Sequence, residues 1–253
     1  MKSAAELFDL TGKVAVVTGG SRGLGREMVL AYAQAGADVM IVSRKADSCV
    51  ELAKIVEDTT GRQAFPYGCH VGHWDELEGF VDAAWDRFGK VDIWVNNAGM
   101  APTYDHITNV SEELFDKTVG VNFKGPFRLC ALVGQRMSDQ GGGSVINVSS
   151  TGSLRVGPTI IPYAAAKAAL NAMTYGFAAT YGPTVRFNVL MSGPFRTDIA
   201  RNWTDETFAA IQGSSALARV GEPPEIVGAA LYLASDASSY TSCATIRVDG
   251  GIP

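Results

Sequence analysis

Cysteine and histidine are both scarce in this chain. There are four cysteines and three histidines among 253 residues, and no two cysteines have the C-x-x-C spacing of a zinc or redox motif. His70, His73 and His106 likewise share no spacing typical of metal ligands, so we expect no metal site. Dispersed cysteines argue against a disulfide framework and fit a cytoplasmic protein whose thiols stay reduced.

An excess of positive charge and long apolar runs are also absent. Lysine and arginine number 21 against 26 aspartates and glutamates, which gives a net charge of −5, and the basic residues are scattered. A nucleic-acid partner would require a basic patch, so we expect none. No segment approaches the roughly 20 apolar residues needed to cross a bilayer, and charged residues interrupt the N-terminal region. We therefore expect neither a membrane span nor a signal peptide.

Short β-branched runs do occur, and they alternate with longer helical stretches. The predicted strands cover residues 13–18, 38–43, 63–67, 91–96, 144–149, 185–190 and 245–248. The predicted helices cover residues 23–35, 46–59, 75–88, 111–138, 163–181 and 224–234. Alternation of this kind is typical of an α/β fold. We predict one domain over residues 1–253, with a seven-stranded, doubly wound parallel sheet and helices on both faces.

One long stretch fits neither periodicity. Residues 193–222 carry no strand alternation and are long for a connection in a compact domain, so they form either a lid or a disordered segment. Trp203, Phe208 and Ile211 favour a lid that packs against something. We expect residues 194–218 of this segment to line a substrate pocket together with residues 101–109 and 151–162, because all three loops leave the strand ends nearest the expected reaction site.

The first predicted strand ends in a glycine-rich turn. Gly19, Gly23 and Gly25 stand between this strand and the next helix, so the backbone can turn sharply and bring a pyrophosphate to the helix N-terminus. A tight turn without any ligand would need the same glycines and is the alternative for this motif taken alone. Its position after a strand and before a helix favours a dinucleotide site.

The end of the second predicted strand indicates which dinucleotide binds. In folds of this kind the ribose 2′ position lies at the end of that strand, where this chain has Ser43 and no acidic residue. A carboxylate would accept a hydrogen bond from a free 2′-hydroxyl, whereas Arg44 and Arg22 offer charged donors to a 2′-phosphate. The sequence therefore favours NADP(H) over NAD(H), unless Arg44 is a solvated surface arginine.

A second group of motif residues lies much further along the chain. Tyr163 and Lys167 are four positions apart, which places them on one face of a helix. A free tyrosine has a pKa of about 10 and is a poor base at neutral pH, so it needs a nearby positive charge such as Lys167. Tyr163 would then transfer the hydroxyl proton while hydride moves. Ser150, at the end of the preceding strand, could hydrogen-bond to the reacting oxygen.

These motifs make the chain similar to the short-chain dehydrogenase/reductase family over essentially its whole length. The motifs that match in order are Thr18-Gly-x-x-x-Gly-x-Gly25, Asn96-Asn-Ala-Gly99, Val-Asn122-Phe-Lys-Gly, Ser150, Tyr163-x-x-x-Lys167 and Val248-Asp-Gly-Gly251. The resemblance implies a Rossmann fold and a catalytic tetrad of Asn122, Ser150, Tyr163 and Lys167. In the family the asparagine kinks its helix and holds a water of a proton relay; taken alone, Asn122 could equally be a helix-surface amide.

The resemblance also implies the cofactor contacts. The expected cofactor-binding residues are Gly19, Ser21, Arg22, Gly23, Leu24, Gly25, Ser43, Arg44, His70, Val71, Asn97, Ala98, Gly99, Tyr163, Lys167, Gly193 and Thr197. Two positions depart from the family pattern: His70 replaces an acidic residue near the adenine, and Ser192 replaces a proline beside Gly193. Asn97 is expected to support the neighbouring strand, and Thr197 resembles a carboxamide contact.

The combined prediction is an oxidoreductase that transfers a hydride between NADP(H) and a carbonyl or secondary alcohol, with Tyr163 as general acid/base. The small-molecule substrate stays open among hydrophobic ketones, sugar acids and acyl thioesters. Apolar loop residues suit a ketone, whereas Arg155, Arg196 and Arg201 could pair with a carboxylate.

The resemblance also implies a homotetramer, built from the helices that start near Ser111 and Tyr163 and from the C-terminal segment. One alternative function is a catalytically silent NADP(H)-binding sensor or interaction module, which would not need Tyr163 or Ser150. Another is a methyltransferase with a similar sheet, in which Arg44 and the tetrad would have no role.

Overall fold

A parallel β-sheet organises the molecule. The computed structural model describes residues 2–198, 200 and 203–253. Within these residues, seven strands pair in parallel in the order β3-β2-β1-β4-β5-β6-β7. The strands are β1 (Val14–Thr18), β2 (Asp38–Ser43), β3 (Ala64–Gly68), β4 (Ile93–Asn96), β5 (Gly143–Ser150), β6 (Val185–Ser192) and β7 (Thr245–Val248). The strand order reverses between β1 and β4, where ligands bind in folds of this type.

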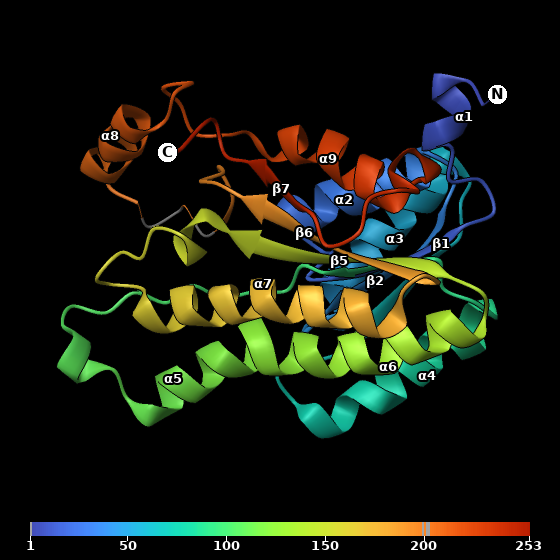
Figure 1. The fold of residues 1–253 in the computed structure, drawn as a ribbon, viewed down its shortest axis with the longest axis horizontal. Helices are drawn as coiled ribbons and strands as arrows, with labels where there is room; N and C mark the ends of the chain where they lie inside the picture. Colours follow the sequence, from blue (N-terminus) through green and yellow to red (C-terminus); the bar gives the residue numbers. More distant parts are fainter. Residues whose placement is uncertain (1, 199, 201–202) are drawn as a thin grey trace.

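Helices cover both faces of this sheet (Figure 1). One buried cluster joins the sheet to Tyr32 of α2, Leu52 of α3 and Leu233 of α9, and the other joins it to Phe80 of α4 and Leu129 of α6. α7 lies beside α6 (Figure 1). The helices are α1 (Ala4–Phe8), α2 (Gly23–Gln34), α3 (Ala46–Thr60), α4 (Leu77–Phe88), α5 (Glu112–Val119), α6 (Gly125–Asp139), α7 (Ile161–Tyr181), α8 (Asp205–Ser214) and α9 (Val227–Ala234).

The predicted α/β fold with a doubly wound, seven-stranded sheet is confirmed. The central strands read as nearly continuous apolar runs because helices bury both of their faces; all five residues of β1 are buried. Each predicted strand is present, with ends shifted by one or two residues. β5 and β6 extend to Ser150 and Ser192, which brings both serines to the sheet edge where the cavity described below opens.

The predicted helix over residues 111–138 is wrong as a single element. It divides into α5, a π-helical turn at Gly120–Lys124, and α6. At this turn the Asn122 side chain donates one hydrogen bond to the Thr118 carbonyl oxygen at 2.9 Å and another to the Met100 carbonyl oxygen at 2.8 Å. The wider π-helical turn therefore lies where the Asn122 side-chain amide links the helix to the segment after β4.

The segment at residues 193–222 contains a helix that the sequence analysis did not predict. α8 is capped by Thr204, whose hydroxyl accepts a hydrogen bond from the Thr207 amide at 3.2 Å. The capping residue followed by Asp205 and Glu206 was the available signal. Phe195 and Gly221 form a single parallel bridge at the base of the segment.

The described residues were expected to contain neither a membrane-spanning helix nor a metal site. No helix there is both long and apolar enough to cross a membrane. The same residues contain no group of three or more histidine, cysteine or acidic side chains arranged to hold a metal ion. All four cysteines are unpaired, and Cys243 is the exposed one among them.

Candidate active site

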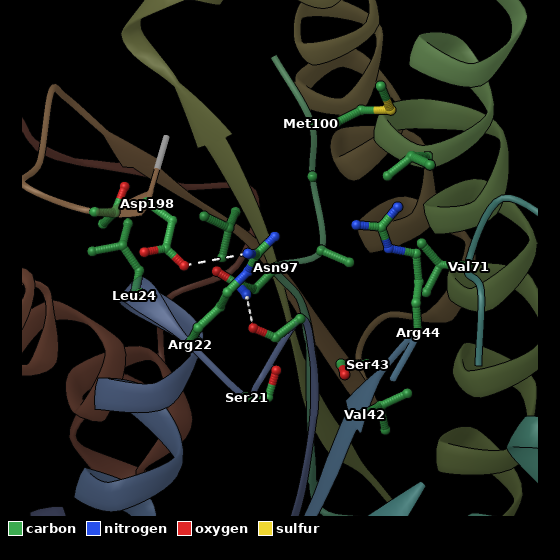
Figure 2. Close-up of a pocket in the computed structure, with 18 of the residues that line it drawn as sticks. Ser21, Arg22, Leu24, Val42, Ser43, Arg44, Val71, Asn97, Met100 and Asp198 are labelled. Atoms are coloured by element: carbon green, nitrogen blue, oxygen red, sulfur yellow. Dashed lines mark hydrogen bonds and ion pairs between the residues drawn. The ribbon is translucent and has the colours of Figure 1, made fainter. Parts of the chain in front are cut away.

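A cavity of about 440 Å³ opens at the carboxyl ends of the central strands. Every predicted cofactor-binding residue except Gly193 lines this cavity, including residues from the ends of β1, β2, β3 and β4 and from α7. Figure 2 shows labelled side chains at the ends of β1, β2 and β4, among them Arg22, Arg44 and Asn97, around the same space. The parallel sheet explains the convergence, because the carboxyl ends of its strands all meet at one edge.

The glycine turn forms one wall of the cavity. Gly19 has a φ of +64°, a left-handed conformation that favours glycine. A Cβ at Gly25 would collide with the Gly19 carbonyl oxygen and with the Asn97 side chain, so α2 approaches the turn more closely than other residues allow. The Asn97 amide donates to the carbonyl oxygens of Thr18 (2.8 Å) and Gly19 (3.1 Å) and holds the turn from β4.

This turn fits the phosphates of a dinucleotide. The first amides of α2 have no partner within the helix and lie at the cavity wall, where an anion can accept their hydrogen bonds. The glycines keep Cβ atoms out of the space between the turn and the helix. A pyrophosphate would therefore meet backbone donors and the positive end of the helix dipole.

The ends of β2 and β3 form the opposite end of the cavity. Arg44 is exposed at its edge, directly after Ser43. The His70 ring stacks on His73 with centroids 4.2 Å apart, and its Nδ1 accepts a hydrogen bond from the Gly72 amide at 3.2 Å. Burial, together with the nearby His73 and Arg44 charges, lowers the pKa of His70. His70 is therefore held next to Arg44 as a neutral ring.

Tyr163 and Lys167 meet the cavity from α7, on one face of the helix. The Lys167 ammonium is buried and donates to the Val148 carbonyl oxygen at 2.8 Å. Its burial lowers the pKa of Lys167 to about 8. Burial raises the pKa of Tyr163, and a hydrogen bond with Ser150 opposes that rise. The two groups thus lie in a low-dielectric wall where a proton can be held or released.

Ser150 and Asn122 stand behind this pair and do not line the cavity. The Ser150 hydroxyl and the Tyr163 ring both lie next to Gly152, because a Cβ on this glycine would be 3.3 Å from the hydroxyl and 3.5 Å from the ring. The two side chains are therefore close to each other. Asn122 is completely buried, which rules out a helix-surface amide. A Cβ at Gly99 would lie 3.1 Å from Asn122 Oδ1 and 3.7 Å from Lys167 Nζ. All four tetrad residues therefore lie around one side of the cavity.

Gly193 is the one predicted cofactor-binding residue that does not line the cavity, and it packs between the ends of β6 and β7. Its amide donates to the Val248 carbonyl oxygen at 2.9 Å, and a Cβ there would come within 2.6 Å of the Asp249 backbone. Glycine is thus required where β6 leaves the sheet beside the end of β7. The neighbouring Ser192 lines the cavity, and its hydroxyl donates to the Ser149 carbonyl oxygen at 3.1 Å.

Several other cavity residues were missed by the sequence analysis. Most of them lie at or near the carboxyl ends of strands and, apart from Val121 beside Asn122, belong to none of the motifs. They are Val42, Lys45, Ser48, Cys69, Met100, Val121, Val148, Ser149, Ser192 and Asp198.

The arginines expected to meet a substrate carboxylate are differently placed. Arg196 pairs with Glu222, with 3.0 Å between Nε and Oε1, and its guanidinium lies 5.1 Å from the centre of the Phe208 ring. Arg155 is exposed in the loop after β5. Arg201 lies outside the described residues. The charge of Arg196 is therefore already matched by a carboxylate of the same segment.

Comparisons with known proteins identify relatives of this chain. A family model described as enoyl-(acyl carrier protein) reductase matches residues 19–253. The short chain dehydrogenase/reductase astE of Aspergillus oryzae (strain ATCC 42149 / RIB 40) is 36% identical over 260 residues, which cover 100% of this chain and 99% of that protein.

Two solved structures extend the comparison. A gluconate 5-dehydrogenase from Burkholderia cenocepacia J2315, in complex with NADP and tartrate, has a TM-score of 0.94 and 31% identity, covering 99% of this chain and 98% of its own. A 7α-hydroxysteroid dehydrogenase, complexed with NADH and 7-oxo glycochenodeoxycholic acid, has a TM-score of 0.93 and 30% identity, covering 99% of this chain and 98% of its own.

The doubly wound sheet, with a cavity at the carboxyl ends of its strands, is shared with solved dehydrogenases, and the matching relatives are oxidoreductases of a family that uses nicotinamide cofactors. The chain belongs to the short-chain dehydrogenase/reductase family, as its motifs predicted. Members of this family act on alcohol and carbonyl groups of small molecules, and that class of reaction is assigned to this chain. A catalytically silent binding module is not favoured.

Proposed function

We propose that this protein is an NADP(H)-dependent oxidoreductase that interconverts a carbonyl compound and a secondary alcohol, with Tyr163 as general acid/base. The observation that carries the proposal is that Tyr163 and Lys167 line the same cavity as the glycine turn. A dinucleotide that spans this cavity would reach the tetrad with one end and Arg44 with the other.

Each tetrad residue has a role in the proposed reaction. A bound nicotinamide cofactor would supply or accept the hydride. In carbonyl reduction Tyr163 donates its proton to the carbonyl oxygen, which Ser150 holds by a hydrogen bond. The Lys167 ammonium stabilises the phenolate left on Tyr163, and Asn122 holds a water through which the proton is replaced. Alcohol oxidation reverses these proton transfers.

The preference for NADP(H) over NAD(H) rests on charge at the end of β2. Arg44 is exposed at the cavity edge beside Ser43, so a 2′-phosphate would meet a cation and no carboxylate at that strand end. Arg22 in the glycine turn adds a second cation at the cavity. One solved relative is complexed with NADP and another with NADH, so the family alone does not decide this preference.

We also infer that residues 1–253 form one domain and that residues 193–222 act as a lid over the substrate. α8 and the pair Trp203–Phe208, with ring centroids 5.5 Å apart, give this segment its own packing. Exposed Leu154 and Val156 offer apolar surface on the loop after β5.

We also infer a cytoplasmic location, which the unpaired thiols fit.

The test compares Tyr163→Phe with the wild type on a panel of ketones, sugar acids and acyl thioesters, followed by NADPH absorbance. We expect Tyr163→Phe to lose about 10²- to 10⁴-fold in turnover, because the phenol proton is gone. The dissociation constant for NADPH should stay the same. Tyr175→Phe is the matched control, because Tyr175 lies on the same helix, is exposed, and contacts only Thr245 through its hydroxyl in the described residues.

Two outcomes would contradict the proposal. Wild-type protein that binds NADPH but turns over no member of the panel would support a silent binding module. Dissociation constants that are equal for NADPH and NADH, or lower for NADH, would refute the cofactor preference.

A further inference from the structure

An ion pair crosses the cavity between two segments far apart in the chain. Arg22 of the glycine turn and Asp198 of the segment after β6 are joined by a contact of 3.3 Å between Nη1 and Oδ2. Both residues line the cavity. Figure 2 shows this pair as a dashed line, with Arg44 projecting from the other side of the same space. Arg22 therefore points toward the segment after β6.

The position of Asp198 is unfavourable for an anionic cofactor. Its carboxylate lies at the wall of a cavity that we propose holds phosphates, so it repels them and also neutralises Arg22. The Arg22 side chain is 66% exposed, and its backbone is extended and unstrained. The guanidinium can therefore leave Asp198 by rotation of its own side chain, without a change in the turn.

We propose that Asp198 is a specificity-determining residue, which competes with the 2′-phosphate of NADP(H) for Arg22. This inference rests on the proposed function, in which Arg22 is a phosphate ligand. NADP(H) gains the contact with Arg22 only by displacing Asp198, whereas NAD(H) has no 2′-phosphate and leaves the pair intact. Asp198 therefore reduces the preference for NADP(H) below the level that Arg22 and Arg44 alone would set.

The test measures dissociation constants for NADPH and NADH in the wild type and in Asp198→Asn. Removing the carboxylate relieves repulsion of the pyrophosphate for both cofactors, so the informative quantity is the ratio of the two constants. We expect the preference for NADPH over NADH to increase about threefold to fivefold, since exposed ion pairs contribute modestly. Asp198→Ser serves as a second variant if Asp198→Asn folds poorly.

A double-mutant cycle separates competition from a general charge effect. In an Arg22→Gln background, Asp198→Asn should leave the NADPH/NADH ratio unchanged, because there is no guanidinium to release. Glu222→Gln is the matched control: it removes a carboxylate of the same segment that pairs with Arg196 at 3.0 Å outside the cavity lining. The ratio should stay at its wild-type value in this variant.

The remaining outcomes overturn the inference. A ratio that is unchanged or lower in Asp198→Asn would mean that Asp198 does not compete or that it holds Arg22 ready for the phosphate. If Asp198→Asn raised the preference for NADPH equally in the Arg22→Gln background, the effect of Asp198 would be a general charge effect and not competition for Arg22. Failure of the proposed cofactor preference is measured separately: the wild-type dissociation constant for NADPH would then be equal to or higher than that for NADH.

Discussion

Lys167 is an ionisable residue held in a place that disfavours its charge. Only 4% of the residue is exposed, and burial lowers its pKa from 10.5 to about 8. The hydrogen bond from Nζ to the Val148 carbonyl oxygen fixes the ammonium at the cavity wall. A cation there assists the proposed proton transfer, but it destabilises the fold relative to an apolar side chain.

This burial predicts how stability varies with pH. The folded-state pKa of Lys167 lies below the value for the unfolded chain, so the unfolded chain binds more protons between about pH 8 and pH 10.5. The free energy of unfolding should therefore rise with pH across that window. From pH 8 to pH 10 we expect the wild type to gain about 2 kcal/mol relative to Lys167→Met, measured by urea denaturation. A difference between the two proteins that does not change with pH would contradict this.

At the scale of elements, two irregular segments shape the site. The π-helical turn at Gly120–Lys124 places Asn122 against Met100 and near Lys167. Residues 193–222 carry α8 between two ends that meet in the bridge between Phe195 and Gly221. The contact of Asn122 with Met100 and the bridge between Phe195 and Gly221 both lie where the backbone departs from a regular helix or strand.

The lid proposal predicts protection by the cofactor. Limited digestion with chymotrypsin should cut near Trp203 and Phe208, and NADPH should slow this cleavage severalfold as the segment closes. Phe8 at the end of α1 is 40% exposed and far from the cavity lining, so cleavage there serves as the control and should keep its rate. Equal rates at Trp203 and Phe208 with and without NADPH would remove the support for a lid.

At the scale of the whole molecule, α6 and α7 leave aromatic side chains exposed. Phe127 of α6 is 42% exposed; its ring stacks on Trp74, with 6.3 Å between ring centroids, and meets Phe177 at a tilt, with 5.5 Å between centroids. Phe115 of α5, a helix that packs against α7, is 48% exposed. We propose that this face joins copies of the chain into a homotetramer, since aromatic side chains supply much of the contact energy in interfaces.

Light scattering tests the assembly. We expect a mass four times that of the 26.7 kDa chain, and a smaller species for Phe127→Glu, because a charge there would be buried without a partner. Val50→Glu on α3 is the control, since Val50 is 53% exposed on the opposite side of the sheet. A wild-type monomer at working concentration would refute the proposal.

Much of the site could be predicted because its residues carry local signals. The spacing of Gly19, Gly23 and Gly25 after a predicted strand indicates a tight turn, because glycine allows backbone conformations that other residues disfavour. The spacing of Tyr163 and Lys167 indicates one face of a helix. Asp198 gave no such signal, since its partner Arg22 is 176 positions away. The packing of Gly193 against Asp249 gave no local signal either, because it depends on how β6 and β7 lie together.

The sequence by itself determined the alternation of strands and helices, the glycine turn and the Tyr163–Lys167 pair, because periodicity and short spacing are properties of neighbouring residues. Only the tertiary structure decided that the Asn122 amide bonds to the Met100 carbonyl oxygen and that Arg22 pairs with Asp198. Each of these depends on side chains brought together by the sheet, and a linear pattern does not encode such contacts.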